Sequence, residues 1–220
     1  MRFRDRAHAG RELARRLAGT SAGAGVVGAI PRGGVVVGLP VAEALGAALV
    51  VVNAHKLTAP IAPEFAFGAL DEDGEILLDR TAVQDLGLDA ADVADVRRLT
   101  WEAMRARLER QGSARLIRWL PGEVVLVDDG LATGLTMLAA VRYARRHGAG
   151  PITVAAPCAS RQAADALRLE AERFVCPVVD PGFAAVGCYY EDFAQVSDAE
   201  VAGLLRAARG RGSGAEDVTG

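Results

Sequence analysis

The chain has 220 residues, of which 51% are hydrophobic, and this is enough for one α/β domain with a buried core and a small added lobe. A formal net charge of −3, with acidic and basic residues nearly balanced, excludes the basic footprint of a nucleic-acid-binding protein. No apolar run reaches the roughly 18 residues of a membrane span, and the charged first residues lack the apolar segment of a secretory signal.

Cysteine and histidine usage indicates a reducing compartment and no protein-built metal centre. Cys158, Cys176 and Cys188 are odd in number and form no C-x-x-C pair, which is typical of reduced thiols in a cytoplasmic protein. The three histidines are far apart in the sequence, so we expect no metal-ligand cluster.

Strands and helices alternate in the first fifty residues. Residues 5–17 carry an apolar stripe at helical spacing and predict an amphipathic helix. A strand over 26–30, a helix from the turn at 31–34 through about Leu45, and a strand over 48–52 follow. Two strands joined by a helix form a βαβ unit with parallel strands.

The middle of the chain lacks the alternation of strands and helices. Residues 55–64 contain two prolines and are expected to form a loop, whereas 65–70 and 75–78 flank a turn and predict an antiparallel hairpin. Residues 89–111 predict a long, arginine-rich helix. Its arginines could bind a polyphosphate, but a solvated face paired with Glu102 and Glu109 is the preferred interpretation.

The second half returns to alternating strands and helices. Strands are expected over 124–127, 152–156 and 173–178, with helices from Met137, over 161–170, and from Asp198. This alternation predicts an α/β fold with a doubly wound, mostly parallel sheet. We expect one domain over 1–209 and a disordered tail over 210–220, which is rich in glycine and polar residues.

Residues 124–137 are the most informative segment. Four apolar residues predict a strand buried on both faces, and Asp128 and Asp129 follow at its carboxyl end, where open α/β sheets bind ligands. A loop rich in glycine and threonine then leads into a helix, and amides at such a helix start can cradle a phosphate. The two carboxylates would repel a phosphate but can accept hydrogen bonds from vicinal hydroxyls. The segment therefore predicts a site for ribose 5-phosphate.

This segment resembles the phosphoribosyl-pyrophosphate (PRPP) signature of type I phosphoribosyltransferases: an apolar strand, two acids, a variable pair and a T-G-x-T turn. The resemblance implies that Asp128 and Asp129 hold the ribose hydroxyls. It also implies a 5-phosphate loop, whose residues are Ala132, Thr133, Gly134, Leu135 and Thr136.

A second loop, Pro31-Arg32-Gly33-Gly34, follows the first strand and lies at the same sheet edge. Its glycines permit close approach of a ligand, and Arg32 supplies positive charge for pyrophosphate oxygens. In the family this is the pyrophosphate loop, often with a cis non-proline peptide, which we expect between Pro31 and Arg32. The family also implies Lys56 as a basic residue near pyrophosphate, so Arg32 and Lys56 are the expected catalytic residues.

Two variable segments complete the resemblance. Residues 57–73 correspond to a mobile loop that closes over PRPP and shields the reaction from water; Glu64 is its candidate acid, and a surface carboxylate is an equal alternative. Residues 179–196 correspond to the hood that holds the acceptor base. Phe183 or Tyr189 would stack on that base, although aromatic packing within the lobe is an equal alternative.

The residues do not determine which base would accept the phosphoribosyl group. Ala132 stands where 6-oxopurine enzymes of the family carry an acid, and residues 157–160 offer no lysine for an oxo group. The signature loop is closer to adenine phosphoribosyltransferases, whereas the insertion at 81–111 and the hood are not. Over nearly its full length the chain looks most like predicted bacterial phosphoribosyltransferases of unassigned acceptor.

The resemblance implies a cytoplasmic transferase that binds PRPP and Mg²⁺ and passes the phosphoribosyl group to a nitrogenous base, with pyrophosphate as product. Mg²⁺ would be bound mainly through PRPP, and relatives commonly form homodimers. No nucleic-acid or membrane partner is expected. Two alternatives remain open: a non-catalytic PRPP sensor, and a PRPP pyrophosphohydrolase with water as acceptor.

Overall fold

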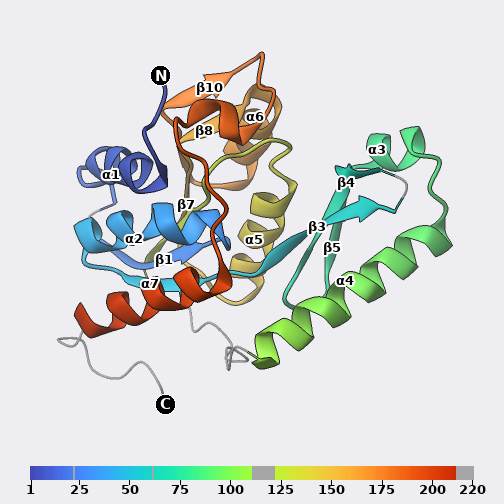
Figure 1. Cartoon of the computed structure of the whole chain (residues 1–220), viewed down its shortest axis with the longest axis horizontal. Coiled ribbons are helices and arrows are strands. Elements are labelled where there is room, and N and C mark those ends of the chain that lie inside the picture. The colour runs from blue at the N-terminus through green and yellow to red at the C-terminus, as the bar shows by residue number, and fades with distance from the viewer. Residues whose placement is uncertain (22, 61, 111–121, 212–220) are drawn as a thin grey trace.

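A parallel sheet lies at the centre of the molecule. The structure, a computed structural model, describes residues 1–21, 23–60, 62–110 and 122–211. Five parallel strands have the order β2-β1-β6-β7-β9 (Figure 1). Their bounds are Ala24–Ala29 (β1), Ala48–Val51 (β2), Glu123–Val127 (β6), Ile152–Ala155 (β7) and Arg173–Val175 (β9).

Helices cover both faces of this sheet, as a doubly wound fold requires. One face packs against α1 (Arg6–Leu17) and α2 (Gly33–Leu45), and the other against α5 (Leu135–Arg146) and α6 (Arg161–Glu170). Successive residues of β6 alternate between these two cores: Val125 and Val127 belong to the first, Val124 and Leu126 to the second. The α/β fold with a mostly parallel sheet is thus confirmed.

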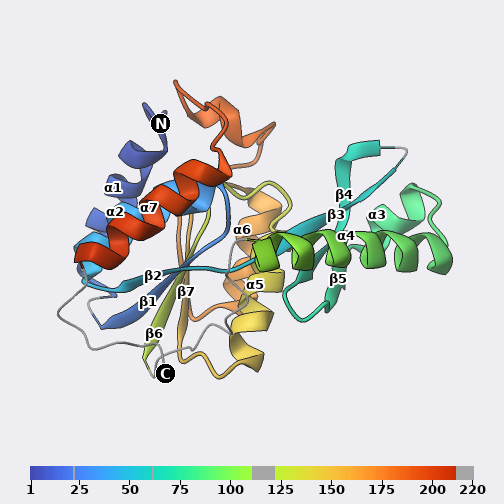
Figure 2. The same cartoon turned by 60° about the horizontal axis from the view of Figure 1, so that its bottom comes forward.

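The predicted helix starts agree with their caps. Asp5 is the N-cap of α1. Its backbone is extended, and its carboxylate accepts a hydrogen bond from the His8 amide at 2.6 Å. Ser160 caps α6 in the same way through the Ala163 amide at 3.0 Å. The last helix, α7 (Asp198–Arg211), packs on α2 and β2 (Figure 2). It includes residues 210 and 211, which were predicted to begin the tail; residues 212–220 lie outside the described residues.

A separate arm extends from the sheet (Figures 1 and 2). It consists of a three-stranded antiparallel sheet, β3 (Ala54–Ala59), β4 (Ala62–Asp71) and β5 (Ile76–Leu78), with α3 (Arg80–Asp85) and α4 (Ala90–Arg110). The arm has its own apolar core, which includes Leu57, Phe67 and Met104. The predicted hairpin is confirmed, and β5 pairs with residues 68–70 of β4.

The prediction of a loop over residues 55–64 is wrong, because this segment forms most of β3 and the start of β4. Leu57 and Ala59 are fully buried, and β3 pairs with β4 from Ala54 opposite Asp71 to Ala59 opposite Ala62. The prolines fall near the connection, at 60 and 63, where irregular register tolerates a missing amide donor. The tertiary pairing with β4 therefore outweighs the local signal.

The arginine face of α4 is occupied by local contacts. Arg98 pairs with Asp95 at 3.3 Å and with Glu102 at 3.5 Å, and Arg97 Nε donates to the Gly74 carbonyl at 2.9 Å. These contacts agree with a solvated, ion-paired face. The side chains of residues 107–110, part of the same prediction, lie outside the described residues.

The hood, residues 179–196, sits above the carboxyl edge of the sheet. Its base is a parallel pair of short strands, β8 (Cys158–Ser160) and β10 (Val178–Asp180), followed by the 3₁₀ turn η1 (Val186–Tyr189). The single strand predicted over 173–178 is wrong: β9 ends at Val175 and β10 starts at Val178 in another sheet. Pro177 separates them because it has no amide to donate to a ladder.

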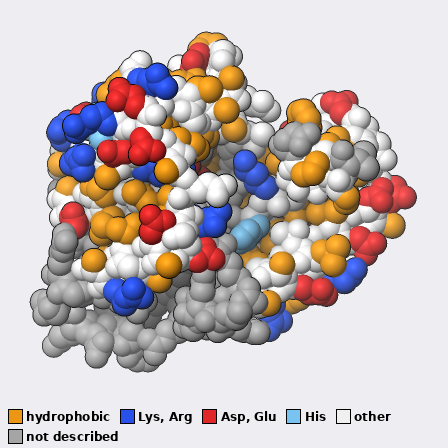
Figure 3. All heavy atoms as spheres, in the orientation of Figure 1, with side chains coloured by type: hydrophobic (Ala, Val, Ile, Leu, Met, Phe, Trp, Pro, Cys, Tyr) orange, Lys and Arg blue, Asp and Glu red, His pale blue; other side chains and the backbone are white. Residues whose placement is uncertain are grey.

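Among the described residues, no helix combines the length and the apolar character needed to cross a bilayer. On the face in Figure 3, Lys and Arg side chains are scattered among Asp and Glu side chains.

Candidate functional site

A cavity of about 380 Å³ opens at the carboxyl edge of the parallel sheet. It brings together the loop after β1, the start of β3 and the loop between β6 and α5. Most of the residues predicted from sequence line it: Arg32, Gly33, Lys56, Asp128, Asp129, Ala132, Thr133, Gly134 and Thr136. Three predicted residues do not: Gly34, Leu135 and Phe183.

The two acids stand directly after β6. The Asp129 amide donates to Asp128 Oδ1 at 2.7 Å, which turns the first carboxyl back onto the backbone. Burial at the sheet edge raises the pKa of Asp128 well above its ordinary value, the negative charge of Asp129 raises it further, and the Lys56 ammonium opposes the shift. The pair therefore carries less negative charge toward an anionic ligand than two free carboxylates would.

The phosphate loop is fixed by backbone conformation and by β8. Gly134 has a φ of +77°, and a Cβ there would lie 3.0 Å from the Ala163 Cβ, so both conformation and space require glycine. The Ser160 hydroxyl donates to the Ala132 carbonyl at 2.5 Å, and the Leu131 amide donates to the Cys158 carbonyl at 2.9 Å. The loop amides are thus held at the amino end of α5, where an anion is favoured.

The loop after β1 packs tightly against the acids. A cis peptide bond joins Pro31 and Arg32, as predicted. A Cβ at Gly34 would lie 2.8 Å from the Val127 carbonyl, and one at Gly33 would collide with the Asp129 carboxylate. Glycine at both positions therefore lets this loop contact the end of β6. Gly33 lines the cavity, whereas Gly34 does not.

Lys56 reaches the cavity from the arm. It is the only lysine in the chain, beside 24 arginines, and it is exposed on β3 within the cavity lining. Arg32 stands across the cavity on the sheet side, with 46% of its side chain exposed and its guanidinium 4.0 Å from Asp198. Two cations thus face one space from two different parts of the fold.

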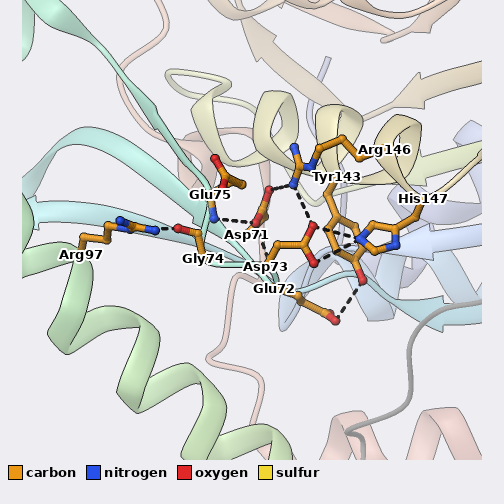
Figure 4. A network of polar contacts seen from close by, with 9 residues as sticks. All are labelled: Asp71, Glu72, Asp73, Gly74, Glu75, Arg97, Tyr143, Arg146 and His147. Carbon is orange, nitrogen blue, oxygen red and sulfur yellow. Dashed lines mark hydrogen bonds and ion pairs between the residues drawn. The ribbon is translucent and has the colours of Figure 1, made fainter.

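An acidic turn anchors the strand that carries Lys56 (Figure 4). Arg146 of α5 contacts Asp71 at 2.5 Å and Asp73 at 3.1 Å, and His147 lies 2.9 Å from Asp73. In the same turn, Glu72 accepts from the backbone amide and the side-chain amide of Asn53, at 2.9 and 2.7 Å. The start of β3 is therefore fixed to the core through polar contacts.

Titration of this turn follows from its surroundings. Burial raises the pKa of Glu72, which the hydrogen bonds from Asn53 only partly offset. Burial alone would raise the pKa of Asp73, but the hydrogen bonds from His147 and Arg146 outweigh it and lower that pKa. Asp73 therefore holds its charge in the pairs that join arm and core.

Phe183 does not reach the cavity. Its ring stacks on Tyr189 with centroids 5.0 Å apart and an interplanar angle of 20°, and both rings belong to the apolar cluster under the hood. Tyr189 is also held by a hydrogen bond to Asp180 at 2.6 Å. The geometry therefore gives Phe183 a packing role, and stacking on a base stays a prediction. Val186 is the hood residue of η1 that lines the cavity.

Several lining residues were not predicted as site residues, among them Arg6, Gln195 and Val196. Arg6 Nε lies 2.7 Å from Asp129 Oδ2, a contact across 123 positions of sequence. No local signal in the sequence tells where the Arg6 side chain points.

Comparisons with known proteins agree with this geometry. The chain is 42% identical over 204 residues (92% of its length) to proteins of two Mycobacterium tuberculosis strains, CDC 1551 and H37Rv, each named "putative phosphoribosyl transferase". It spans about half the length of these relatives (46%). No protein-family model matches the chain.

A solved structure gives the same picture. The crystal structure of TT1426 from Thermus thermophilus superposes with a TM-score of 0.76 at 42% identity, covering 93% of this chain and 98% of that one. These similarities agree with the geometry of the site, namely its paired acids, its phosphate loop and the strand order of the sheet. The chain belongs to the same family as these "putative phosphoribosyl transferase" proteins.

Proposed function

We propose that this protein is a phosphoribosyltransferase that binds PRPP with Mg²⁺ and transfers its phosphoribosyl group to a nitrogenous base, releasing pyrophosphate. One observation carries the proposal: paired acids, a phosphate loop and two cations from different parts of the fold line a single cavity of about 380 Å³. Each of these features matches one portion of PRPP, namely the ribose hydroxyls, the 5-phosphate and the pyrophosphate.

The sugar phosphate would lie along the end of β6. The 5-phosphate takes the amides of the loop before α5 together with the Thr136 hydroxyl, because these donors carry no negative charge and meet the positive end of the helix. The ribose hydroxyls donate to the carboxyls of Asp128 and Asp129. Holding both ends of the sugar fixes its C1 atom relative to the attacking base.

The leaving group would lie between Arg32 and Lys56. The bond from C1 to the pyrophosphate oxygen breaks and that oxygen keeps the electron pair, while the nitrogen of the base supplies the pair for the new bond to C1. Charge therefore develops on pyrophosphate, where a guanidinium and an ammonium stabilise it. Gly33 lines the same cavity, so its backbone is close to the proposed pyrophosphate position.

The donor chemistry of the site suits Mg²⁺. The cavity offers carboxylate oxygens, and among the described residues no three His, Cys, Asp or Glu side chains are grouped so that they could hold a metal ion. Mg²⁺ prefers oxygen ligands and commonly keeps waters and substrate phosphates in place of an all-protein cage. When bound, it would neutralise charge on the pyrophosphate and on the sugar hydroxyls.

The acceptor would enter beside Val186, Gln195 and Val196, which line the cavity from the hood side. Ala132 provides no acid at the position next to the phosphate loop, so the site itself offers no general base there. The base class, the homodimer and the cytoplasmic location stay predictions.

The first experiment is calorimetry of the purified chain with PRPP in the presence of Mg²⁺, followed by a screen of bases for isotope exchange between pyrophosphate and PRPP. Binding with base-dependent exchange supports the transferase. Base-independent release of pyrophosphate would support the hydrolase alternative, and the absence of any heat would contradict a PRPP site.

The single lysine allows a sharper readout. An amine-directed acylating reagent can modify side chains in this chain only at Lys56, so modification followed by mass spectrometry reports on one atom of the site. PRPP and pyrophosphate should each protect Lys56, and ribose 5-phosphate should not, because the ammonium faces the pyrophosphate end. Equal protection by all three would contradict this orientation.

An Arg32→Ala variant separates the enzyme from a PRPP sensor. A transferase should lose product formation while PRPP binding largely survives through the acids and the phosphate loop. A sensor would have no product formation to lose in the wild-type chain.

A further inference from the structure

Arg6 occupies a junction between four segments. It lies in the first turn of α1, yet its side chain, only 12% exposed, reaches the acids after β6, the loop after β1 and the end of the hood. It lines the site cavity, and it also lines a neighbouring cavity of about 450 Å³ between α1, α2 and α7. Arg6 therefore forms part of the wall between the two cavities.

The guanidinium makes three different contacts. Its Nε donates to Asp129 Oδ2 at 2.7 Å, its Nη1 donates to the Ala194 carbonyl at 2.7 Å, and its carbon centre lies 3.8 Å from the centre of the Phe193 ring. The first contact is a charge-assisted hydrogen bond with both side chains mostly buried. The other two are made to residues 193–196, which we call the strap.

The segment that delivers Arg6 is itself held in place. The Phe3 amide donates to the Tyr189 carbonyl, and the Glu191 amide donates to the Phe3 carbonyl, both at 2.8 Å. The Asp192 amide donates to the Arg4 carbonyl at 2.8 Å. The N-terminal residues thus run beside the hood like an added strand, and Arg6 follows from a fixed backbone.

Space around this pair is limited. A Cβ at Gly33 would lie 2.8 Å from Arg6 Nε and would collide with the Asp129 carboxylate. The ion pair therefore crosses directly over the loop that the pyrophosphate would contact. The hydrogen bond from Arg6 to Oδ2 fixes the direction of the Asp129 carboxylate, whose remaining lone pairs can accept hydrogen bonds from a ligand.

We propose that Arg6 is a positioning residue that orients the Asp129 carboxylate toward the ribose hydroxyls of PRPP and joins that acid to the strap at the acceptor side of the cavity. The inference rests on the proposed function, and it adds a physical link between the two substrate sites. Gln195 and Val196 of the strap line the cavity, so a group that fixes the strap also fixes that wall.

Only an arginine can play both parts of this role. Its planar fork presents several donors in fixed directions, so one guanidinium can reach the carboxylate and the Ala194 carbonyl together and still lie flat on the Phe193 ring. A lysine ammonium is a compact charge that can pair with Asp129 without preserving the contact to the ring.

The test compares Arg6→Gln, Arg6→Lys and the wild-type chain by calorimetry with two probes, PRPP and inorganic pyrophosphate, each with Mg²⁺. Arg15→Gln is the matched control, because Arg15 lies on the same helix with 67% of its side chain exposed. We expect Arg6→Gln to weaken PRPP binding by about tenfold, as for one lost charge-assisted hydrogen bond. Pyrophosphate binding should fall clearly less than PRPP binding, because the proposed pyrophosphate position lies between Arg32 and Lys56 and not on Asp129.

Arg6→Lys should recover most of the PRPP affinity, since it restores the charge beside Asp129, and it also serves if the glutamine variant does not fold. Amide hydrogen exchange of residues 193–196 should become faster in both variants and stay unchanged in Arg15→Gln. Combining Arg6→Gln with Asp129→Asn should cost no more than the larger single change, because both remove the same interaction.

Several outcomes would overturn the inference. Equal loss of PRPP and pyrophosphate binding would show a general structural defect, and unchanged PRPP binding in Arg6→Gln would remove the positioning role. Unchanged exchange of the strap would break the link to the acceptor side. If the wild-type chain binds pyrophosphate but not PRPP, the proposed function fails, and this inference fails with it.

Discussion

The site is built from two regions that are held together by different means. The wall formed by the loop between β6 and α5 rests on buried apolar strands, on backbone hydrogen bonds to β8 and on a glycine in the left-handed conformation. The wall that carries Lys56 belongs to the arm. Besides apolar contacts of Ala54, Ala69 and Leu77 with the main core, polar contacts of Asp71 and Asp73 with Arg146 and His147 attach the arm.

This difference assigns different physical roles to the two walls. Close-packed interiors resist displacement, so the sheet-side wall can hold a phosphate in one geometry. Ion pairs with a partly exposed partner depend on salt and pH, so this attachment responds to solution conditions more than the apolar wall does. The comparison is consistent with a rigid sugar-phosphate site and a more adjustable pyrophosphate cover, and closure of the arm over PRPP stays a prediction.

The largest effect is expected from the rigid wall. Gly134→Ala should lower PRPP affinity by about 100-fold and destabilise the fold by about 1–2 kcal/mol, because a Cβ meets Ala163 at 3.0 Å in a left-handed backbone. Gly148→Ala is the control: its φ is +82°, but no atom lies within 4 Å of the added carbon. Calorimetry and thermal unfolding measure both. Equal PRPP affinities in the two variants would show that the space around Gly134 does not matter.

Lys56→Gln tests the arm wall. We expect kcat to fall by about 100-fold, since one cation at the leaving pyrophosphate is removed, while the thermal midpoint stays within about 2 °C of the wild-type value because Lys56 is exposed. Lys56→Arg keeps the charge and should recover part of the rate. Single-turnover kinetics separate chemistry from product release, and an unchanged chemical step in Lys56→Gln would remove Lys56 from the site.

Asp128→Asn sharpens the contrast between stability and function. The pKa of Asp128 is raised in the folded chain, so between about pH 4 and that raised pKa the folded carboxyl keeps its proton while the unfolded carboxyl has lost it. The free energy of unfolding of the wild-type chain therefore falls as pH rises through this range. The asparagine variant should lose this dependence and gain about 1 kcal/mol at pH 7. PRPP affinity should fall by about tenfold. Unfolding curves across pH check the sign, and a less stable variant at pH 7 would contradict it.

The smallest effect concerns the link between arm and core. The lowered pKa of Asp73 means that its pairs with His147 and Arg146 persist above the ordinary aspartate range and are lost as pH falls through the folded-state value. Asp73→Asn should reduce kcat/KM by about threefold, because Lys56 is then less well placed.

Amide NMR shifts of residues 72–75 should titrate with a midpoint below about 4 in the wild-type chain and stay flat in Asp73→Asn. Asp95→Asn is the control, since Asp95 is an exposed aspartate that pairs with Arg98 on α4, within the same helix. If both variants have the wild-type kcat/KM, the acidic turn does not help to place Lys56.

Sequence reasoning alone was sufficient where the signal is local. The segment from Val124 to Met137 predicts a strand, two acids, a phosphate loop and a helix because each feature depends on neighbouring residues: apolar runs for the strand, glycine for the turn and periodic apolar residues for the helix. The loop after β1 could be placed beside it for a general reason, since carboxyl ends of parallel strands meet at one sheet edge.

Only the tertiary structure decided the rest. Residues 55–59 and 62–64 belong to strands because β3 and β4 pair with each other, which no local pattern reveals. Phe183 packs on Tyr189 within the aromatic cluster of the hood. Arg6 reaches Asp129 across 123 positions, a contact set by how α1 and the hood fold against the sheet. Local preferences depend on neighbouring residues, whereas long-range contacts depend on the whole chain. The sequence therefore predicted the loops that line the cavity, and the tertiary structure determined which residues surround them.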